Sequence, residues 1–404
     1  MAPIDTINRL VSFRERGPGT RAEREAADYL AGELKAHGRD AEIEPIRVRT
    51  AYHLTHALHA ALGVIGSVAS VYVEPLGVAI LLLAAVSMYL DLTGRLHLAR
   101  LLMPRRPSQN VTSRGPKPDA PAHIVLTAHY DAARSGLLFW KWSRPPGRLR
   151  KALAGLAGPI DVVFWSIIVV LLFSVARLFI GDESTLFTVA QFLPTVVLIV
   201  AVMLFVDIAL SEVVPGASDN ASGVAATLEL ARRLADRPLE HSDVWVVFPG
   251  AKEGLMLGMR QWMRDHADEL DPRRMFFVNV DTVGRGSVRF VGQEGYVVIS
   301  QHDARLVDLC ASIGTATPQR LRFGTDGLVP LTRGFAAVTV CCTDESGRLP
   351  NYHRHSDTPD QIDPQALANA IAFTEELVRR IDLELVPSIF PTVAQPAGTS
   401  ASAR

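Results

Sequence analysis

The sequence predicts an α/β protein with a mostly parallel central sheet, covered by helices on both faces, and with two inserted transmembrane helical hairpins. The α/β part follows from apolar, strand-like runs that alternate with amphipathic helical segments, a pattern typical of such sheets. The hairpins follow from four long apolar stretches. These stretches are Leu54–Val73, Leu76–Leu90, Ile160–Ile180 and Leu186–Val206.

The composition and charge of the chain argue against some classes of function. The chain has 404 residues and a formal net charge of −1, which gives no bulk electrostatic case for a nucleic-acid partner. Its three cysteines, Cys310, Cys341 and Cys342, form no C-x-x-C pair and suit a reducing compartment. The first 50 residues are polar and rich in arginine, without the apolar core of a signal peptide.

The first half of the α/β part is interrupted by the apolar stretches. Residues 18–39 carry apolar side chains at helical spacing, and residues 41–48 alternate as in a strand. Residues 110–115 and 123–131 are predicted strands, and the second is apolar enough to be central in the sheet. We therefore assign residues 1–50 and 108–136 to one domain, with insertions at 51–107 and 137–213.

In the second half of the α/β part, predicted helices and strands alternate regularly. Helices are predicted at residues 222–237, 255–270 and 365–385, and strands at residues 244–250, 275–281 and 336–344. Residues 214–386 therefore complete the α/β domain. Residues 387–404 are rich in Pro, Ala, Ser and Thr and are predicted to be disordered.

The apolar stretches are interpreted as two membrane hairpins, because a helix needs about 20 apolar residues to cross a bilayer. A buried core helix remains an alternative for any one stretch. Each insertion contains an even number of spans, so the pieces of the α/β domain stay on one side. Basic residues flank the spans there, which predicts a multi-pass cell-membrane protein with a cytoplasmic domain and the lipid bilayer as a partner. These residues are Arg47, Arg49, Arg95, Arg100, Arg105, Arg106, Arg148, Arg150 and Lys151, whereas the opposite turns carry Glu74, Asp182 and Glu183.

Imidazoles and carboxylates follow the strand-like runs. Asp131, Glu253 and Asp281 each come just after an apolar strand, and ligands bind beyond the carboxyl ends of parallel strands. Carboxylate and imidazole ligands without a thiolate suit zinc, cobalt or manganese rather than a structural zinc cage. A carboxylate can also bridge two metal ions. The candidate set is His129, Asp131, Asp219, Glu253, Asp281 and His353.

The segment PGASDNASGVAATLELAR resembles the bridging-aspartate segment of the di-zinc aminopeptidase family, which also contains glutaminyl cyclases and glutamate carboxypeptidase. The resemblance covers residues 5–50, 108–136, 214–295 and 323–383, and it implies a zinc exopeptidase-like fold with two zinc ions per chain. It assigns one ion to His129, Asp219 and Asp281, and the other to Asp219, Glu253 and His353. Asp131 would orient the first imidazole.

Two positions depart from the family pattern. Lys252 in KEGLMLGM stands where the family has its general-base glutamate, and Gly327 in TDGLVPL replaces a histidine. A protonated lysine has no lone pair with which to accept a proton from water. The resemblance implies a membrane-bound zinc metallopeptidase that hydrolyses peptide bonds by a di-metal-bound hydroxide, with Lys252 at the base position and a peptide or membrane-proximal substrate.

Other readings of the chain remain open. The alternative to the peptidase is a catalytically weak or inactive peptidase-like membrane scaffold. A transporter is disfavoured, because the spans hold few ionisable residues and no evident repeat. Aminopeptidase, carboxypeptidase and cyclase specificities stay open, as does the oligomeric state. His53, His56 and His59, which begin the first apolar stretch, are read as interfacial polar residues rather than a metal or proton path.

Overall fold

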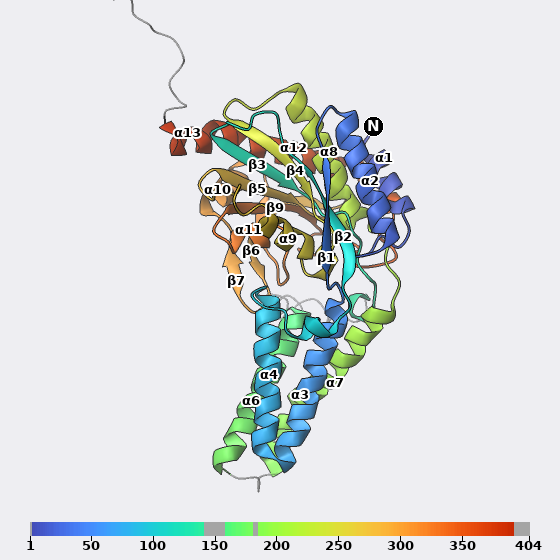
Figure 1. Cartoon of the computed structure of the whole chain (residues 1–404), viewed down its shortest axis with the longest axis vertical. Helices are drawn as coiled ribbons and strands as arrows, with labels where there is room; N and C mark the ends of the chain where they lie inside the picture. The colour runs from blue at the N-terminus through green and yellow to red at the C-terminus, as the bar shows by residue number, and fades with distance from the viewer. Residues whose placement is uncertain (1, 141–157, 181–184, 392–404) are drawn as a thin grey trace, which may run out of the picture.

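The computed structural model describes residues 2–140, 158–180 and 185–391. The predicted basic flank at 148–151, the turn acids Asp182 and Glu183, and residues 392–404 of the predicted tail lie outside the described residues. Figure 1 shows an α/β body built around a twisted sheet, from which α3, α4, α6 and α7 project to one side as a bundle.

The sheet has nine strands in the order β1-β2-β4-β3-β5-β9-β6-β7, with β8 paired to β6. The central strands β4, β3, β5 and β9 are parallel, as predicted, whereas the pairs β1-β2, β2-β4, β6-β9 and β6-β7 are antiparallel. The strands are β1 (Glu42–Val48), β2 (Arg106–Ser113), β3 (Ala122–Thr127), β4 (Ser242–Phe248), β5 (Met275–Val280), β6 (Ser287–Gly295), β7 (Ile299–Gln301), β8 (Thr317–Arg320) and β9 (Ala336–Thr343).

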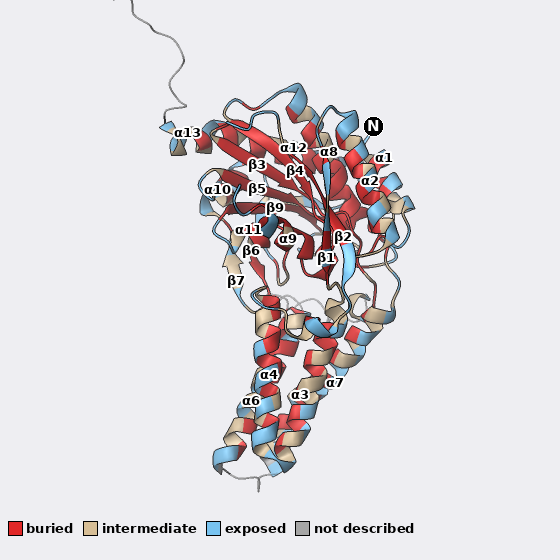
Figure 2. Ribbon diagram, viewed as in Figure 1, coloured by how far each residue is buried: buried red, intermediate tan, exposed pale blue. Residues whose placement is uncertain are grey.

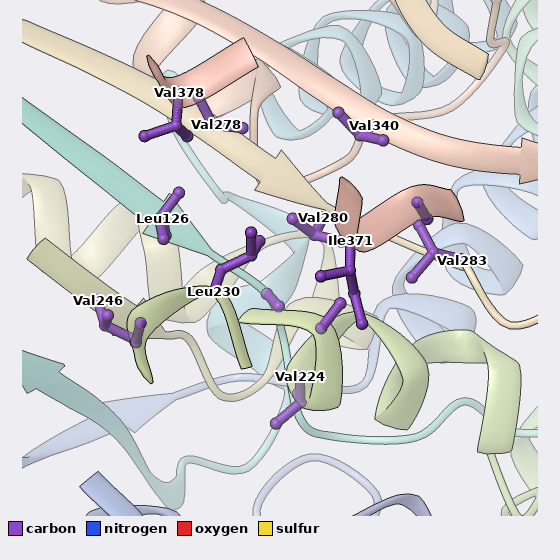
Figure 3. Close-up of a cluster of buried hydrophobic side chains, with 14 of the residues drawn as sticks. Leu126, Val224, Leu230, Val246, Val278, Val280, Val283, Val340, Ile371 and Val378 are labelled. Carbon is purple, nitrogen blue, oxygen red and sulfur yellow. The ribbon is translucent and has the colours of Figure 1, made fainter. Parts of the chain in front are cut away.

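Helices cover both faces of the parallel centre, which explains why these strands are buried and mostly apolar. The helices of the α/β body are α1 (Pro3–Ser12), α2 (Arg21–Ala36), α8 (Gly223–Asp236), α9 (Leu257–Asp265), α10 (Ala304–Ser312), α11 (Leu328–Leu331), α12 (Pro364–Arg380) and α13 (Val386–Ile389). On one face, Leu126 and Val278 pack with Leu230 of α8 and Val378 of α12 (Figure 3). Because neighbouring strand residues point to opposite faces, Val125 joins the core on the other face.

The bundle consists of four helices that are long and apolar enough to cross a membrane. They are α3 (Tyr52–Tyr72), α4 (Glu74–Leu92), α6 (Pro159–Ile180) and α7 (Thr185–Leu210). Their outward faces expose large apolar side chains such as Leu172 (63% exposed) and Leu193 (67%), and Figure 2 shows these faces in pale blue. Such surfaces are suited to contact with lipid rather than water.

The bundle and the sheet share one apolar core. Phe277 of the central sheet and Trp262 of α9 belong to the same buried cluster as Leu81, Ile167 and Leu198 of the bundle. The bundle is therefore packed onto one face of the α/β body, and the two parts form a continuous interior.

Two of the histidines that begin α3 lie between the helices of the bundle. His56 and His59 are fully buried there. His59 Nε2 lies 2.9 Å from Ser87 Oγ of α4, and His56 Nε2 lies 3.7 Å from a carboxylate oxygen of Asp91. These polar contacts link α3 to α4 within the bundle.

Candidate active site

Three neighbouring parallel strands deliver side chains to one edge of the sheet. His129 and Asp131 follow β3, Glu253 lies in a short helical turn after β4, and Asp281 follows β5. Because the carboxyl ends of parallel strands lie at the same edge, these side chains meet although they are far apart in sequence.

Two further side chains of the site come from loops. Asp219 lies in the turn that leads into α8, and His353 lies in the loop after β9. One oxygen of Asp219 is 3.4 Å from His129 Nε2, and its other oxygen is 3.4 Å from His353 Nε2. His129 Nε2 is also 3.8 Å from Asp281, and His353 Nε2 is 3.3 Å from Glu253.

These side chains form two groups of potential metal ligands. His129, Asp219 and Asp281 make one group, and Asp219, Glu253 and His353 make the other, with the ligand atoms of each group within 4.8 Å of one another. Asp219 belongs to both groups and turns one oxygen to each imidazole. The geometry thus brings together the two ligand sets that the resemblance implied.

The polar atoms at this centre lack other partners. Among the described residues, His129 Nε2, His353 Nε2, Asp281 Oδ2 and both oxygens of Asp219 are buried without a hydrogen-bond partner. Buried polar atoms are rarely left unpaired in folded proteins. Imidazole nitrogens and carboxylate oxygens that converge in this way fit divalent cations of the zinc, cobalt or manganese type.

Lys252 lies among these ligands. Its Nζ is 2.8 Å from Glu253 Oε1, 3.9 Å from Asp219 Oδ1 and 4.0 Å from Asp281 Oδ2. Burial alone would lower the pKa of Lys252, but the carboxylates of Glu253, Asp281 and Asp219 outweigh it and raise this pKa well above its usual value. Without bound cations these carboxylates therefore favour the ammonium form of Lys252, which would compete with metal ions for them, whereas cations bound there would weaken this attraction.

Asp131 joins the turns after β3 and β4. Its carboxylate accepts hydrogen bonds from the backbone N–H groups of Lys252 (3.1 Å) and Glu253 (2.9 Å). One of its oxygens lies 3.4 Å from His129 Nδ1. Asp131 is thus placed to orient the imidazole and to fix the position of Glu253.

Asp131→Asn is expected to weaken metal binding by roughly 10–100-fold, the usual effect of losing a partner that orients a ligand. The change removes one of two charged acceptors without altering the size of the side chain. Chelator competition at fixed zinc measures the affinity. Asp243→Asn, another buried carboxylate but remote from the centre, is the matched control. Equal affinities in the two variants would contradict this role.

Several residues that hold the backbone of the site were harder to identify from the sequence. Asp357 accepts hydrogen bonds from the backbone N–H groups of Ser218 (2.8 Å) and Asp219 (3.0 Å), and burial raises its pKa to about 7. It belongs to the motif of His353, so the motif could have indicated it. Arg16 and Glu23 come from the N-terminal region, where no local pattern marks them.

The side chains of Arg16 and Glu23 fix the turns of the site through hydrogen bonds to their backbone. Arg16 is buried and donates to the backbone oxygens of Tyr130 and Gly216. Glu23 accepts from the backbone N–H of Ala251 (2.8 Å), and burial raises its pKa to about 8. Three of the turns that carry potential ligands are therefore fixed by two side chains.

Arg100 connects the first hairpin to the same turn. It is 1% exposed and forms a two-pronged ion pair with Asp91 at the end of α4, at 2.6 and 3.1 Å. Its Nη1 donates to the backbone oxygen of Gly254 (2.7 Å), next to Glu253. The end of α4 is thus tied to the turn that carries Lys252 and Glu253.

Gly327, at one of the two positions that depart from the family pattern, is closely packed. A Cβ at this position would lie 2.5 Å from Thr339 Oγ1, so a larger side chain would displace Thr339. The neighbouring Asp326 is fully buried, and burial raises its pKa to about 7. A histidine at 327 would therefore require the side chain of Thr339 to move.

The fold and the site define an α/β domain of the exopeptidase type with a candidate two-metal centre. Residues 202–378 match the family model for peptidase family M28. This match, together with the solved structures below, confirms the resemblance to di-zinc aminopeptidases and glutaminyl cyclases. A comparison with curated proteins finds no match.

Solved structures share the fold. A glutaminyl cyclase from Bacteroides thetaiotaomicron is 16% identical and covers 94% of this chain and 96% of its own, with a TM-score of 0.54. A Zn-dependent exopeptidase from Parabacteroides distasonis is 14% identical, with coverages of 95% and 97% and a TM-score of 0.52. An aminopeptidase from Aneurinibacillus sp. strain AM-1 is 14% identical, with coverages of 94% and 92% and a TM-score of 0.53.

Proposed function

We propose that this protein is a membrane-bound zinc metallopeptidase that hydrolyses peptide bonds in the manner of an aminopeptidase. One observation carries the proposal. Two buried groups of metal-type ligands share Asp219 at the carboxyl edge of the sheet, as a bridging carboxylate between two metal ions requires.

Each residue of the site has a role in this proposal. His129, Asp219 and Asp281 would hold one zinc ion, and Asp219, Glu253 and His353 the other. Bound zinc would supply Lewis acidity toward a peptide carbonyl and lower the pKa of water. Asp131 orients His129, whereas Lys252 supplies positive charge where a proton acceptor is needed. Because a general base commonly contributes about 10²–10⁴-fold, we expect slow turnover.

Metal analysis and a panel of aminoacyl reporters test the proposal on the full-length protein in lipid nanodiscs. We expect about two divalent ions per chain and reporter release that stops when a chelator removes them. Metal content near zero after purification in zinc-containing buffer would contradict the metal centre. Release that persists without metal would contradict the mechanism.

A second candidate function is favoured by the contacts of Lys252. Its ammonium lies against Glu253 and near Asp219 and Asp281, so it both replaces the base and opposes metal loading. The protein would then be a catalytically weak or inactive peptidase-like membrane scaffold. Metal-loaded protein whose reporter release does not exceed that of Asp219→Ala would support this function.

The proposal includes a membrane topology. Four helices are apolar enough to span a bilayer, and each hairpin leaves the α/β body and returns to it (Figure 1). The basic flanks of the spans favour the cytoplasm for that side. The α/β domain would therefore lie against the cytoplasmic face of the cell membrane.

Cysteine labelling in intact cells checks the topology. All three native cysteines are buried, so the background should be low. A membrane-impermeant maleimide is expected to label Asp182→Cys from outside the cell. It should label Glu25→Cys, on the solvent-facing side of α2, only after permeabilisation. The reverse pattern would place the α/β domain outside the cytoplasm.

A further inference from the structure

A cavity of about 520 Å³ is lined by the loops that follow β5 and β9. Its charged lining residues are Arg285, Arg348, Arg354 and Asp344, so three arginines against one aspartate leave two positive charges in excess. None of the potential metal ligands is among the described residues that line it. Sites for small ligands commonly measure about 300–1,000 Å³, so this cavity has room for a phospholipid headgroup.

The single carboxylate of the lining is already paired. One oxygen of Asp344 lies 2.7 Å from Arg348 Nη2. Arg285 instead donates a hydrogen bond to the neutral side chain of Gln361 (2.8 Å). Among the residues that the structure describes, no carboxylate forms an ion pair with Arg285, which is exposed. Its charge is therefore accessible to an anion from outside the chain.

Arg354 also lacks a counter-ion. Its Nε donates to the backbone oxygen of Phe139 (2.7 Å), whereas its Nη2 is buried without a hydrogen-bond partner among the described residues. Burial and then the nearby charge of Arg348 lower the pKa of Arg354. Buried polar groups without a partner are unfavourable. An anion that accepts a hydrogen bond from Nη2 would remove this penalty and the repulsion between the two arginines.

The rest of the sequence offers no acidic side chain for these arginines. Residues 141–157 contain five basic residues and no aspartate or glutamate, and residues 392–404 contain no acidic residue either. Asp182 and Glu183 follow the end of α6 that is remote from the α/β body (Figure 1). An anion that pairs with Arg285 and Arg354 would therefore be a ligand.

The cavity is connected to the domain-side end of α7. Arg354 is bonded to the short helix η2 (Leu137–Phe139), and the N–H of Leu137 donates to Asp207 of α7 (2.7 Å). Asp207 is the first charged residue of this helix, as expected where a helix leaves the hydrocarbon core. Trp140, which follows η2, is 51% exposed, and tryptophan is enriched at the level of the headgroups. The cavity thus lies beside the predicted membrane surface.

We propose that this cavity binds the phosphate group of an anionic phospholipid from the adjoining membrane leaflet. A guanidinium group can pair with phosphate through two parallel hydrogen bonds, and basic pockets beside membrane helices recognise anionic headgroups. A zwitterionic headgroup would bring its own cation next to the arginines. The proposal requires the four helices to span a membrane, but it is independent of peptide hydrolysis. Because Arg354 directly follows His353, a bound headgroup would also hold the loop that carries this potential metal ligand.

Native mass spectrometry of the full-length protein in detergent tests the proposal. The probes are phosphatidylglycerol and phosphatidylcholine with the same acyl chains, each titrated separately. Phosphatidylglycerol is expected to bind roughly 10-fold or more tightly, the scale that hydrogen bonds to charged groups imply. Equal binding of the two lipids would overturn the assignment.

Two variants each remove one arginine of the cavity. Arg285→Gln and Arg354→Gln are each expected to lower the affinity for phosphatidylglycerol about 10-fold and to leave that for phosphatidylcholine unchanged. Arg285 is exposed, so its variant decides the matter even if Arg354→Gln does not fold. Arg273→Gln removes the same charge before β5, at the opposite edge of the sheet and outside the cavity lining. This matched control should keep the native affinity.

The remaining outcomes identify the source of the phosphate. Glycerophosphoglycerol is the headgroup of phosphatidylglycerol without the acyl chains, and it should displace the lipid only at much higher concentration. Binding as tight as that of the lipid would make the cavity a site for a soluble phosphate compound and overturn the lipid assignment. A lipid preference that both cavity variants leave unchanged, or that Arg273→Gln weakens as much as Arg285→Gln, would show that the cavity is not the binding site.

Discussion

Lys252→Glu is expected to raise peptide hydrolysis by about 10²–10⁴-fold, the usual contribution of a positioned general base. The substitution removes the ammonium that lies 2.8 Å from Glu253 and puts a carboxylate in its place. That carboxylate can accept a proton from water, whereas the ammonium cannot. The measurement is kcat for the best reporter substrate, compared at equal zinc occupancy.

Lys252→Gln is the matched control for this change. Glutamine has nearly the same shape as glutamate and also removes the positive charge, so both variants should load metal more readily. Only glutamate supplies a base. Equal gains in the two variants at equal zinc occupancy would assign the effect to loss of the positive charge rather than to a new base. A native enzyme that is fast and is slowed by Lys252→Glu would make Lys252 a participant in the reaction.

Asp219→Ala is expected to lower the metal content from about two ions per chain to nearly none. Asp219 belongs to both ligand groups, so its loss weakens both sites at once. The affinity loss should exceed the roughly 10–100-fold that follows from losing a partner of a ligand. Metal analysis after gel filtration gives the content, and chelator competition gives the affinity.

Asp303→Ala tests whether that loss reflects general destabilisation. Asp303 caps the N-terminus of α10 through the backbone N–H groups of Arg305 and Leu306, and removing such a cap costs roughly 0.5–2 kcal/mol. This variant should retain its metal. An Asp219→Ala protein that keeps one ion at native affinity would show that Asp219 is not shared.

The fold could be predicted where the local pattern is strong. The central strands β3, β5 and β9 are mostly apolar runs, and α8 and α12 have clear helical periodicity, so each was indicated by its own residues. The edge strand β1 was also indicated, by its alternation, but β6, β7 and β8 were not. β6 is only partly buried, and β8 is mostly exposed, so their place in the sheet is decided by pairing with distant strands rather than by a local pattern.

Some residues of the candidate site could likewise be predicted from the sequence, and others could not. His129, Asp219 and His353 lie in recognisable motifs, and the structure brings them together. Arg16 and Glu23 could not be found in the sequence, because their contacts with Gly216 and Ala251 span about half of the chain. Only the folded chain reveals that two N-terminal side chains fix these turns.

The contact between Arg100 and Gly254 limits how this protein can be divided. Removing Asp91 alone would leave a buried guanidinium without its counter-ion, a change that costs about 3–5 kcal/mol in comparable pairs. Removing residues 51–107 would delete Arg100 itself and release the turn beside Glu253. The first hairpin therefore could not be replaced by an unrelated membrane anchor without loss of this contact. A water-soluble fragment without the first hairpin would lack the Arg100 contact that holds the turn of Glu253. Substitutions in the hairpin and in this turn are therefore expected to depend on each other.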